Sequence, residues 1–211
     1  MGRVNFNGGT LLAPLPAVMV SVGEGEEANI ITVAWVGILS STPPRAYISV
    51  RPKRHSHKLL TKTGEFVINL TTESLALATD FCGIYTGAKL NKFEKCALTP
   101  IASKCVGAPT IKESPLSLEC RVFEVINSGT HDIFMADIVN VSCDESLLDE
   151  NGRIRYDKAG LLAYSHGEYF ALGKRLGKFG YSTDKKNKAK LTKREPAPCE
   201  KKRTYKKGAG K

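Results

Sequence analysis

The chain has 211 residues, of which 42% are hydrophobic and 25% are charged, and this is the composition of a globular protein with one sizeable core. No apolar run reaches the roughly 18 residues that a membrane-spanning helix needs, and the N-terminus lacks the apolar segment of a signal peptide. We therefore expect a soluble protein located in the cytoplasm.

The net charge of +10 comes from the C-terminal end alone. Residues 185–211 hold 12 Lys or Arg and 2 Glu, a balance of +10, whereas residues 1–184 hold 19 basic and 19 acidic residues, a balance of zero. A body without a positive field argues against nucleic-acid binding, which remains open only through the tail. We predict a single domain over residues 1–184 and a basic, disordered tail over residues 185–211.

The six cysteines contain no C-x-x-C pair, so the spacing of zinc, iron–sulfur and thioredoxin-like sites is missing. The pattern favours reduced thiols that act as small hydrophobic side chains, over a redox role, and it predicts no metal site. These residues are Cys82, Cys96, Cys105, Cys120, Cys143 and Cys199.

In chain order the body alternates β-prone runs with short helical segments. The predicted strands cover residues 16–22, 30–38, 46–50, 65–70, 117–126, 131–142 and 168–172, and the predicted helices cover 56–63, 73–81 and 90–97. Gly64 is expected to end the first helix, and the turn at 127–130 to join the two long strands as a hairpin. A meander with little helix between its strands predicts a mainly β fold, an antiparallel, Greek-key-like β-barrel with short helices.

One glycine motif is misleading. Gly23-x-Gly25-x-x-Ala28 fits the dinucleotide fingerprint formally, but three glutamates occupy the loop and a β-branched run follows it. Carboxylates repel phosphate, and the fingerprint needs a helix after the loop. We interpret this segment as a solvated hairpin turn.

A basic cluster follows the third predicted strand. The run Ser49-Val50-Arg51-Pro52-Lys53-Arg54-His55-Ser56-His57 places three fixed cations, two imidazoles and a hydroxyl at a strand end that leads into a helix. Guanidinium groups and free helix amides can together hold a phosphate monoester. Composition alone favours the alternative, a solvated basic loop.

An ordered set of segments along the chain favours the phosphate site over the solvated loop. The set resembles the flavin-reductase-like, FMN-binding split-barrel family, and its last two segments resemble the flavoredoxin branch; the similarity extends from Pro14 to Tyr181. The segments are Asn29-Ile30-Ile31-Thr32-Val33-Ala34-Trp35, Pro43-Pro44, Ser49-Val50-Arg51-Pro52, His55-Ser56, Gly64-Glu65-Phe66-Val67-Ile68-Asn69-Leu70, Thr79-Asp80-Phe81-Cys82-Gly83, Lys92-Phe93-Glu94, Pro115-Leu116-Ser117-Leu118-Glu119-Cys120, Gly129-Thr130-His131-Asp132-Ile133-Phe134, Tyr164-Ser165-His166-Gly167-Glu168-Tyr169-Phe170 and Gly177-Lys178-Phe179-Gly180-Tyr181.

The resemblance implies noncovalently bound FMN, with its ring against the second and third strands and its phosphate near the basic cluster. It also implies a homodimer in which both chains shape each flavin site. Carried over by position, the cofactor-binding residues are Asn29, Thr32, Val33, Ala34, Trp35, Ser49, Val50, Arg51, Arg54, His55, Ser56, Cys82, Lys92 and His131.

Four of these residues have competing interpretations. Trp35 is a flavin contact or an aromatic of the barrel core, and Lys92 is a flavin ligand or a surface lysine. Cys82 is at most a contact near the ring. His131, after the turn glycine, is our candidate for chemistry, against a structural role at a strand start, and His166 is a second candidate.

Two functions are compatible with this reading. The favoured one is a flavoredoxin-type carrier that transfers electrons between redox protein partners through FMN. The alternative is an NAD(P)H-dependent flavin or ferric reductase. Many flavin reductases have Gly-Asp-His where this chain has Gly129-Thr130-His131, and that departure weakens the reductase assignment more than it weakens FMN binding.

Overall fold

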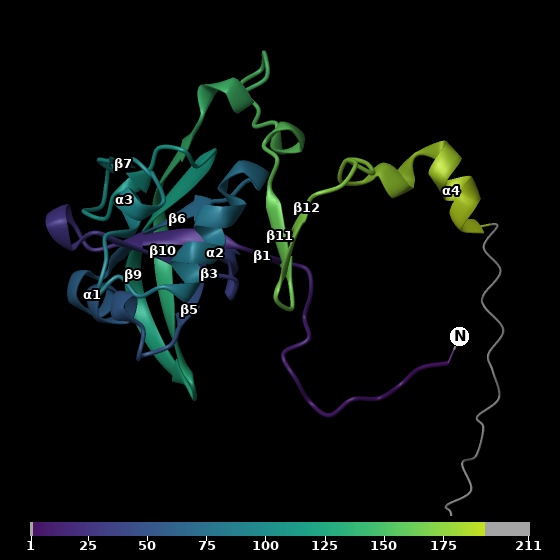
Figure 1. Cartoon of the computed structure of the whole chain (residues 1–211). Helices are drawn as coiled ribbons and strands as arrows, with labels where there is room; N and C mark the ends of the chain where they lie inside the picture. The colour runs from purple at the N-terminus through teal and green to yellow at the C-terminus, as the bar shows by residue number, and fades with distance from the viewer. Residues whose placement is uncertain (1, 193–211) are drawn as a thin grey trace, which may run out of the picture. The chain divides into compact units, whose positions relative to one another are not determined.

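The computed structural model describes residues 2–192, and the chain divides into two compact units between Gly173 and Lys174 (Figure 1). This division lies earlier than the domain end that we predicted at residue 184, because residues 172–178 have no regular secondary structure. No helix in the described part is both long and apolar enough to cross a membrane.

The described part of the second unit contains a 3-10 turn, η5 (Tyr181–Thr183), and the helix α4 (Lys185–Thr192). This helix lies in the segment that we predicted to be disordered. Lys and Ala are strong helix formers. Our prediction of disorder relied on the high charge of the segment and gave too little weight to this helix propensity. The rest of the predicted tail lies outside the described residues.

The first unit is built on a seven-stranded antiparallel sheet, which confirms the predicted mainly β fold (Figure 1). Its order is β3-β2-β6-β9-β10-β5-β4. The strands are β2 (Val18–Val22), β3 (Asn29–Val33), β4 (Val36–Ser41), β5 (Pro44–Val50), β6 (Glu65–Leu70), β9 (Leu116–Ser128) and β10 (His131–Cys143).

The link between β3 and β4 closes this sheet into a barrel. The two strands lie at opposite edges of the sheet, yet only Ala34 and Trp35 separate them in the chain. Three peptide steps reach at most about 11 Å, so the sheet must curl until its edges meet. Ser49 on β5 then donates its backbone N–H to the Trp35 carbonyl over 2.9 Å.

Our prediction of one strand over residues 30–38 is therefore wrong, because the run breaks at this link. Neither glycine nor proline marks the break in the sequence, since barrel closure causes it. By contrast, the Gly23–Ala28 segment joins the antiparallel strands β2 and β3 through the short 3-10 turn η1 (Gly25–Glu27), as a hairpin connection.

The core lies on both faces of β2, where every residue is buried. Val18, Val20 and Val22 point into the barrel, and Met19 points to the opposite face, beneath the helices. The barrel core also contains Phe66, Ile68, Phe134 and Ile48, and the second cluster contains Ile30, Leu75, Cys82, Phe93 and Ile111.

Three helices pack on the side of the barrel formed by β2 and β3. They are α1 (His55–Thr63), α2 (Ala76–Ile84), which follows the 3-10 turn η2 (Glu73–Leu75), and α3 (Lys92–Lys95). Helix α1 ends at Gly64 in the left-handed conformation (φ +65°), as predicted. The predicted helix over 90–97 is shorter than expected because Asn91 caps it, accepting hydrogen bonds from the Phe93 and Glu94 amides.

A separate three-stranded sheet has the order β1-β11-β12. Its strands are β1 (Leu15–Pro16), β11 (Leu162–Ser165) and β12 (Glu168–Ala171), of which the sequence predicted only β12. The remaining elements are the two-residue strands β7 (Pro100–Ile101) and β8 (Thr110–Ile111) and the 3-10 turns η3 (Glu145–Leu147) and η4 (Tyr156–Lys158).

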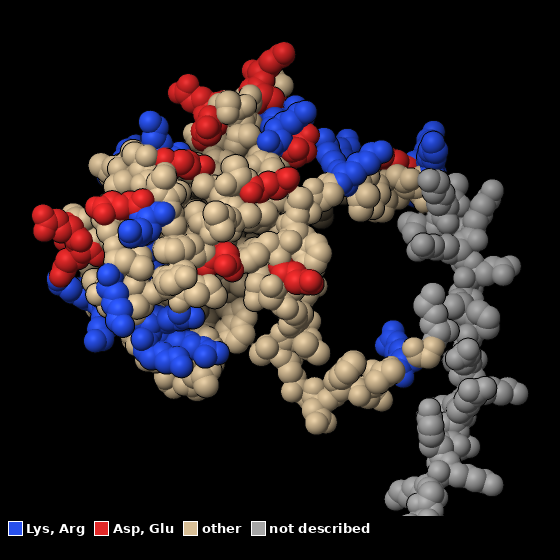
Figure 2. Space-filling view, viewed as in Figure 1, with Lys and Arg blue, Asp and Glu red and all other residues tan. Residues whose placement is uncertain are grey.

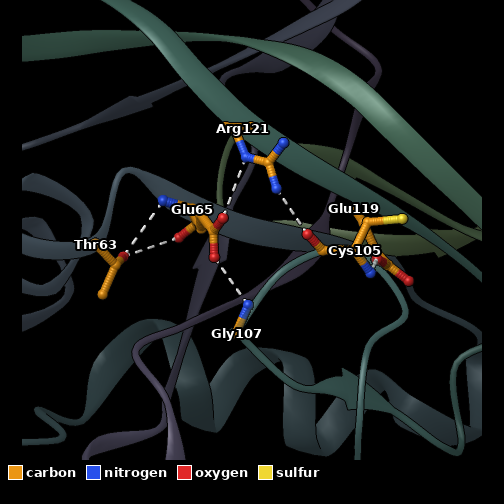
Figure 3. A network of polar contacts seen from close by, with 6 residues as sticks. All are labelled: Thr63, Glu65, Cys105, Gly107, Glu119 and Arg121. Atoms are coloured by element: carbon orange, nitrogen blue, oxygen red, sulfur yellow. Dashed lines mark hydrogen bonds and ion pairs between the residues drawn. The ribbon is translucent and has the colours of Figure 1, made fainter.

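Two glutamates on neighbouring strands hold the loop before β8 (Figure 3). Glu119 accepts hydrogen bonds from the backbone amides of Lys104 and Cys105, over 3.0 and 2.6 Å, and from the Asn140 side chain. Glu65 accepts from the Gly107 amide over 2.8 Å and pairs with Arg121. The loop therefore depends on two carboxylates for the partners of its backbone amides.

Replacing Glu119 by Ala should lower the free energy of unfolding by about 1–3 kcal/mol, because it removes a buried acceptor and leaves three part-buried donors without it. Burial alone would raise the pKa of Glu119, but hydrogen bonds from Lys104, Asn140 and Cys105 outweigh it and lower the pKa. The stabilisation is therefore present above the unfolded-state pKa and is lost as the pH falls through the folded-state value. Urea unfolding at pH 7 and at pH 3.5 measures both effects.

The control is Glu124→Ala, which removes an exposed glutamate from the same strand and should change stability by less than about 0.5 kcal/mol. Equal losses in the two variants, or a loss for Glu119→Ala that does not depend on pH, would contradict this account.

Candidate functional site

Two adjoining cavities lie where the link between β3 and β4 meets β5 and the start of α1. The larger has a volume of about 500 Å³ and the smaller about 320 Å³, and both are lined by Ile31, Arg51 and Arg54. The basic residues of the two linings are Arg51, Lys53, Arg54 and Lys92, and the acidic one is Asp80. Figure 2 shows Lys and Arg gathered on the part of the body that carries α1.

The smaller cavity contains the N-terminus of α1. No side chain caps this helix end, and His55 and Ser56 of its first turn line the cavity. The Asn29 side chain donates to Ser56 Oγ over 2.8 Å. An uncapped helix N-terminus leaves amide donors free for an anion, and the surrounding guanidinium groups favour the same charge.

Lys92 is buried in the wall of the smaller cavity. Its Nζ donates to the Ile30 carbonyl over 2.7 Å and to the Cys82 carbonyl over 2.8 Å, so it ties β3 to α2. Burial lowers the pKa of Lys92 to about 8, and the Arg54 guanidinium acts in the same direction. An anion in this cavity would reverse that shift by favouring the charged amine.

Gly87, on the same wall, must be a glycine. A Cβ atom at this position would lie 2.0 Å from Asn29 Oδ1, so any larger residue would displace the Asn29 side chain. Residues 85–87 line the smaller cavity, and Gly87 lies against the Asn29 side chain of β3.

The larger cavity is lined by aromatic rings from two directions. Trp35 and His131 lie with their ring centroids 4.5 Å apart, and Tyr164 and Tyr169 with theirs 5.4 Å apart. Arg54 connects the cavities and donates to the Gly83 carbonyl over 3.2 Å. A planar ligand with an anionic tail matches this division into an aromatic and a cationic chamber.

His131 is a neutral imidazole in this arrangement. Arg51 Nε donates to His131 Nε2 over 3.3 Å, so the ring proton lies on Nδ1, which is 2.9 Å from Thr130 Oγ1. Burial lowers the pKa of His131, and the positive charge of Arg51 lowers it further. His131 thereby holds a guanidinium at the border of the two cavities, while its role in chemistry stays a prediction.

The structure brings together every residue that the sequence assigned to the cofactor. The smaller cavity is lined by Asn29, His55, Ser56, Cys82 and Lys92, the larger by Thr32, Val33, Ala34, Trp35, Ser49, Val50 and His131, and both by Arg51 and Arg54. Val33 and Val50 are side chains of the barrel core, so we infer that they contribute to the wall through their backbone. Binding of FMN by these residues stays a prediction.

Two of the competing interpretations are wrong. Trp35 is 38% exposed, so it is not an aromatic of the core, and Lys92 is 3% exposed, so it is not a surface lysine. His166 does not line either cavity; it lies in the turn between β11 and β12 with a positive φ of 47°.

Sequence reasoning missed several lining residues. On the smaller cavity these are Ile31, Lys53 and residues 85–87, and on the larger Ala17, Asp80, Gly83, Ile84, Tyr164, Gly167 and Tyr169. Lys53 lies inside the predicted basic cluster. The remainder come from α2 and from the small sheet, whose positions over the barrel follow from tertiary packing alone.

The cysteines of the described part are free thiols. Cys82 Sγ lies 3.9 Å from Cys96 Sγ, and burial raises the pKa of Cys82 to about 12. A thiol in that state is a poor nucleophile, which favours the predicted structural role. Cys199 lies outside the described residues.

Comparison with known proteins gives a consistent result. Residues 11–173 match the flavin reductase like domain. The structure of flavoredoxin from Desulfovibrio vulgaris (Miyazaki F) aligns with a TM-score of 0.81 and 29% identity, over 86% of this chain and 100% of that one.

Two sequence relatives support the match. An uncharacterized protein of Archaeoglobus fulgidus is 35% identical over 145 residues, 69% of this chain and 81% of its own. The FMN reductase (NADH) RutF of Agrobacterium fabrum is 27% identical over 120 residues, 56% of this chain and 67% of its own. The chain therefore belongs to the flavin reductase-like domain family, with the split β-barrel fold that the resemblance in its sequence predicted.

Proposed function

We propose that this protein is a flavoredoxin-type electron carrier that holds FMN noncovalently across the two adjoining cavities. The observation that carries the proposal is the junction at Arg51 and Arg54 between an aromatic chamber and a cationic one. Bound flavin would supply the electron chemistry, and the protein would supply orientation and electrostatics.

The smaller cavity fits a phosphate monoester. The first-turn amides of α1 and the Arg54 guanidinium offer donors, and Ser56 and Asn29 add a hydroxyl and an amide at 2.8 Å from one another. A volume of about 320 Å³ accommodates one phosphate with part of a ribityl chain. A pyrophosphate with an adenosine would need a further chamber, so we propose FMN and not FAD.

The larger cavity fits the isoalloxazine ring. The backbone from Thr32 to Trp35 lies between two strands, where its N–H and C=O groups can meet the polar edge of the ring. Trp35 and the two tyrosines offer aromatic surfaces to a planar ligand. His131 would act here by holding Arg51 in place.

The structural match to a flavoredoxin, which extends over the whole length of that protein, favours the carrier over an NAD(P)H-dependent reductase. The reductase alternative is supported by the family description and by the relative named as an NADH-dependent FMN reductase. The acidic residue that many reductases have before the histidine is Thr130 here, and its hydroxyl lies 2.9 Å from His131 Nδ1.

The proposal includes a homodimer. Phe123 and Val125, two residues apart on β9, are 41% and 50% exposed, and self-association would cover this apolar surface. The redox protein partner of a carrier would need access to the flavin outside that contact.

Under anaerobic conditions NADH or NADPH alone should reduce the bound flavin slowly, over seconds or longer, because a carrier receives electrons from a reduced protein. Stopped-flow absorbance of the flavin band, with each nucleotide in turn and with dithionite as the control for full reduction, measures the rate. Complete bleaching within milliseconds by either nucleotide would establish the reductase instead.

The affinity for FMN should fall as the pH rises from 7 to 9.5. Free Lys92 loses its proton near pH 8, whereas a bound phosphate favours the charged amine, so binding takes up a proton in this range. A shift of one pKa unit on binding corresponds to about a tenfold loss of affinity. Fluorescence titration with FMN measures the effect.

Riboflavin, which lacks the phosphate, and the Lys92→Met variant serve as controls and should give flat pH profiles. A wild-type FMN profile as flat as that of riboflavin would remove Lys92 from the phosphate site.

A further inference from the structure

The hairpin formed by β11 and β12 is one wall of the larger cavity. We propose that a hydrogen bond between Tyr169 on this hairpin and Asp80 on α2 latches that wall shut, and that the latch limits the access of a nicotinamide donor to the flavin. The claim about nicotinamide access rests on the proposed function, because that function places the flavin ring in the larger cavity. The claim that the hydrogen bond holds the hairpin does not rest on it.

The hairpin is a stiff unit with a tight turn. Ser165 and Glu168 pair across a two-residue connection, and both of its residues have positive φ, 47° at His166 and 95° at Gly167. Positive φ at both central positions is the geometry of a type I′ turn, which holds two antiparallel strands in register. Gly167 at the tip lines the larger cavity.

The two strands of the hairpin are attached unequally. β11 pairs with β1 on its other side, and at its base the Leu162 amide donates to the Thr71 carbonyl over 3.1 Å. β12 is the edge of its sheet, paired with β11 alone. Within residues 2–192, the hydrogen bond that ties β12 to anything outside the hairpin is the one from Tyr169 Oη to Asp80 Oδ1, at 3.3 Å.

The latch joins two walls of one cavity. Asp80, Gly83 and Ile84 line it from α2, and Gly167 and Tyr169 line it from the hairpin. Phe170 of β12 is 47% exposed, so its side chain adds little packing to hold this strand. Breaking the bond therefore frees the edge strand and the tip, while β11 stays in place.

The tyrosine keeps its proton and donates throughout the neutral range. Burial raises the pKa of Tyr169 to about 12, and the Asp80 charge contributes to the same shift. The latch is thus a charge-assisted hydrogen bond that does not depend on pH near neutrality.

The closed wall matters for a donor that must stack on the ring. Hydride transfer from NADH to bound FMN, with uptake of one proton from water, gives NAD⁺ and reduced flavin and needs the nicotinamide in contact with the ring. A latched hairpin narrows the space for that contact, so its opening adds a step before reduction by NADH.

The first test is hydrogen–deuterium exchange of the full-length protein, followed on peptides that cover residues 161–173. Tyr169→Phe should speed exchange in β12 by about threefold to tenfold, the worth of one hydrogen bond. Asp80→Ala should do the same, and the double variant should add nothing further. Asp80→Asn, whose amide oxygen still accepts a hydrogen bond but carries no charge, should fall between wild type and Asp80→Ala.

The matched control for exchange is Tyr164→Phe, because Tyr164 lies beside Tyr169 in the cavity but its hydroxyl makes no hydrogen bond within the described part of the chain. It should leave the exchange of β12 unchanged. Exchange in Tyr169→Phe that equals wild type, or that equals the control, overturns the latch.

The second test is stopped-flow reduction of the FMN-loaded protein by NADH. Tyr169→Phe should accelerate reduction by the same factor by which it accelerates exchange, and Tyr156→Phe, at an exposed tyrosine outside the cavity, should not. Faster exchange without faster reduction overturns the access claim. A protein that binds no FMN refutes the proposed function and the access claim with it, while the exchange data still decide the latch.

Discussion

Everything at the candidate site depends on the two-residue link between β3 and β4. Because Ala34 and Trp35 must bridge strands at opposite edges of the sheet, the sheet has to close on itself at this point. The residues of this link, together with Thr32 and Val33 at the end of β3, line the larger cavity. The same closure brings β5, and with it the basic cluster, against β3.

The closed barrel places a cationic cavity and an aromatic cavity next to each other. At one end, β5 leads into an uncapped helix surrounded by Arg51, Arg54 and the buried Lys92. At the other, aromatic side chains from the link and from the small sheet line a chamber that shares Arg51 and Arg54 with the first and also contains Asp80. The Arg51–His131 contact lies at the border, so a neutral imidazole on β10 helps to fix the cation that both chambers share. The barrel sheet, the helices α1 and α3 and the small sheet together position these groups.

Much of this arrangement could be predicted from the sequence, where local signals agree with the fold. β6 has the predicted bounds, Gly64 ends α1 as predicted, and the hairpin of β9 and β10 turns at Gly129. The fourteen residues assigned to the cofactor all line the cavities, because the resemblance supplied the long-range information that periodicity lacks.

The features that the sequence did not predict depend on tertiary structure. The break at Ala34 has no glycine or proline to mark it, and nothing in the sequence indicates that Lys92 is buried, since lysine is rarely buried. Its burial becomes possible only when two carbonyls from β3 and α2 accept its hydrogen bonds. Tyr169 and Asp80 are distant in the chain, and only the packing of the small sheet over α2 brings them into contact.

The central claim is that one mononucleotide spans both chambers, with its phosphate in the cationic one. Equilibrium titration of the flavin-free protein with FMN, riboflavin and FAD tests this claim most directly. The account predicts one FMN per chain, riboflavin bound at least about tenfold more weakly because the contacts to a charged phosphate are missing, and FAD weaker than FMN. Riboflavin that binds as tightly as FMN, or FAD that binds more tightly than FMN, would contradict it.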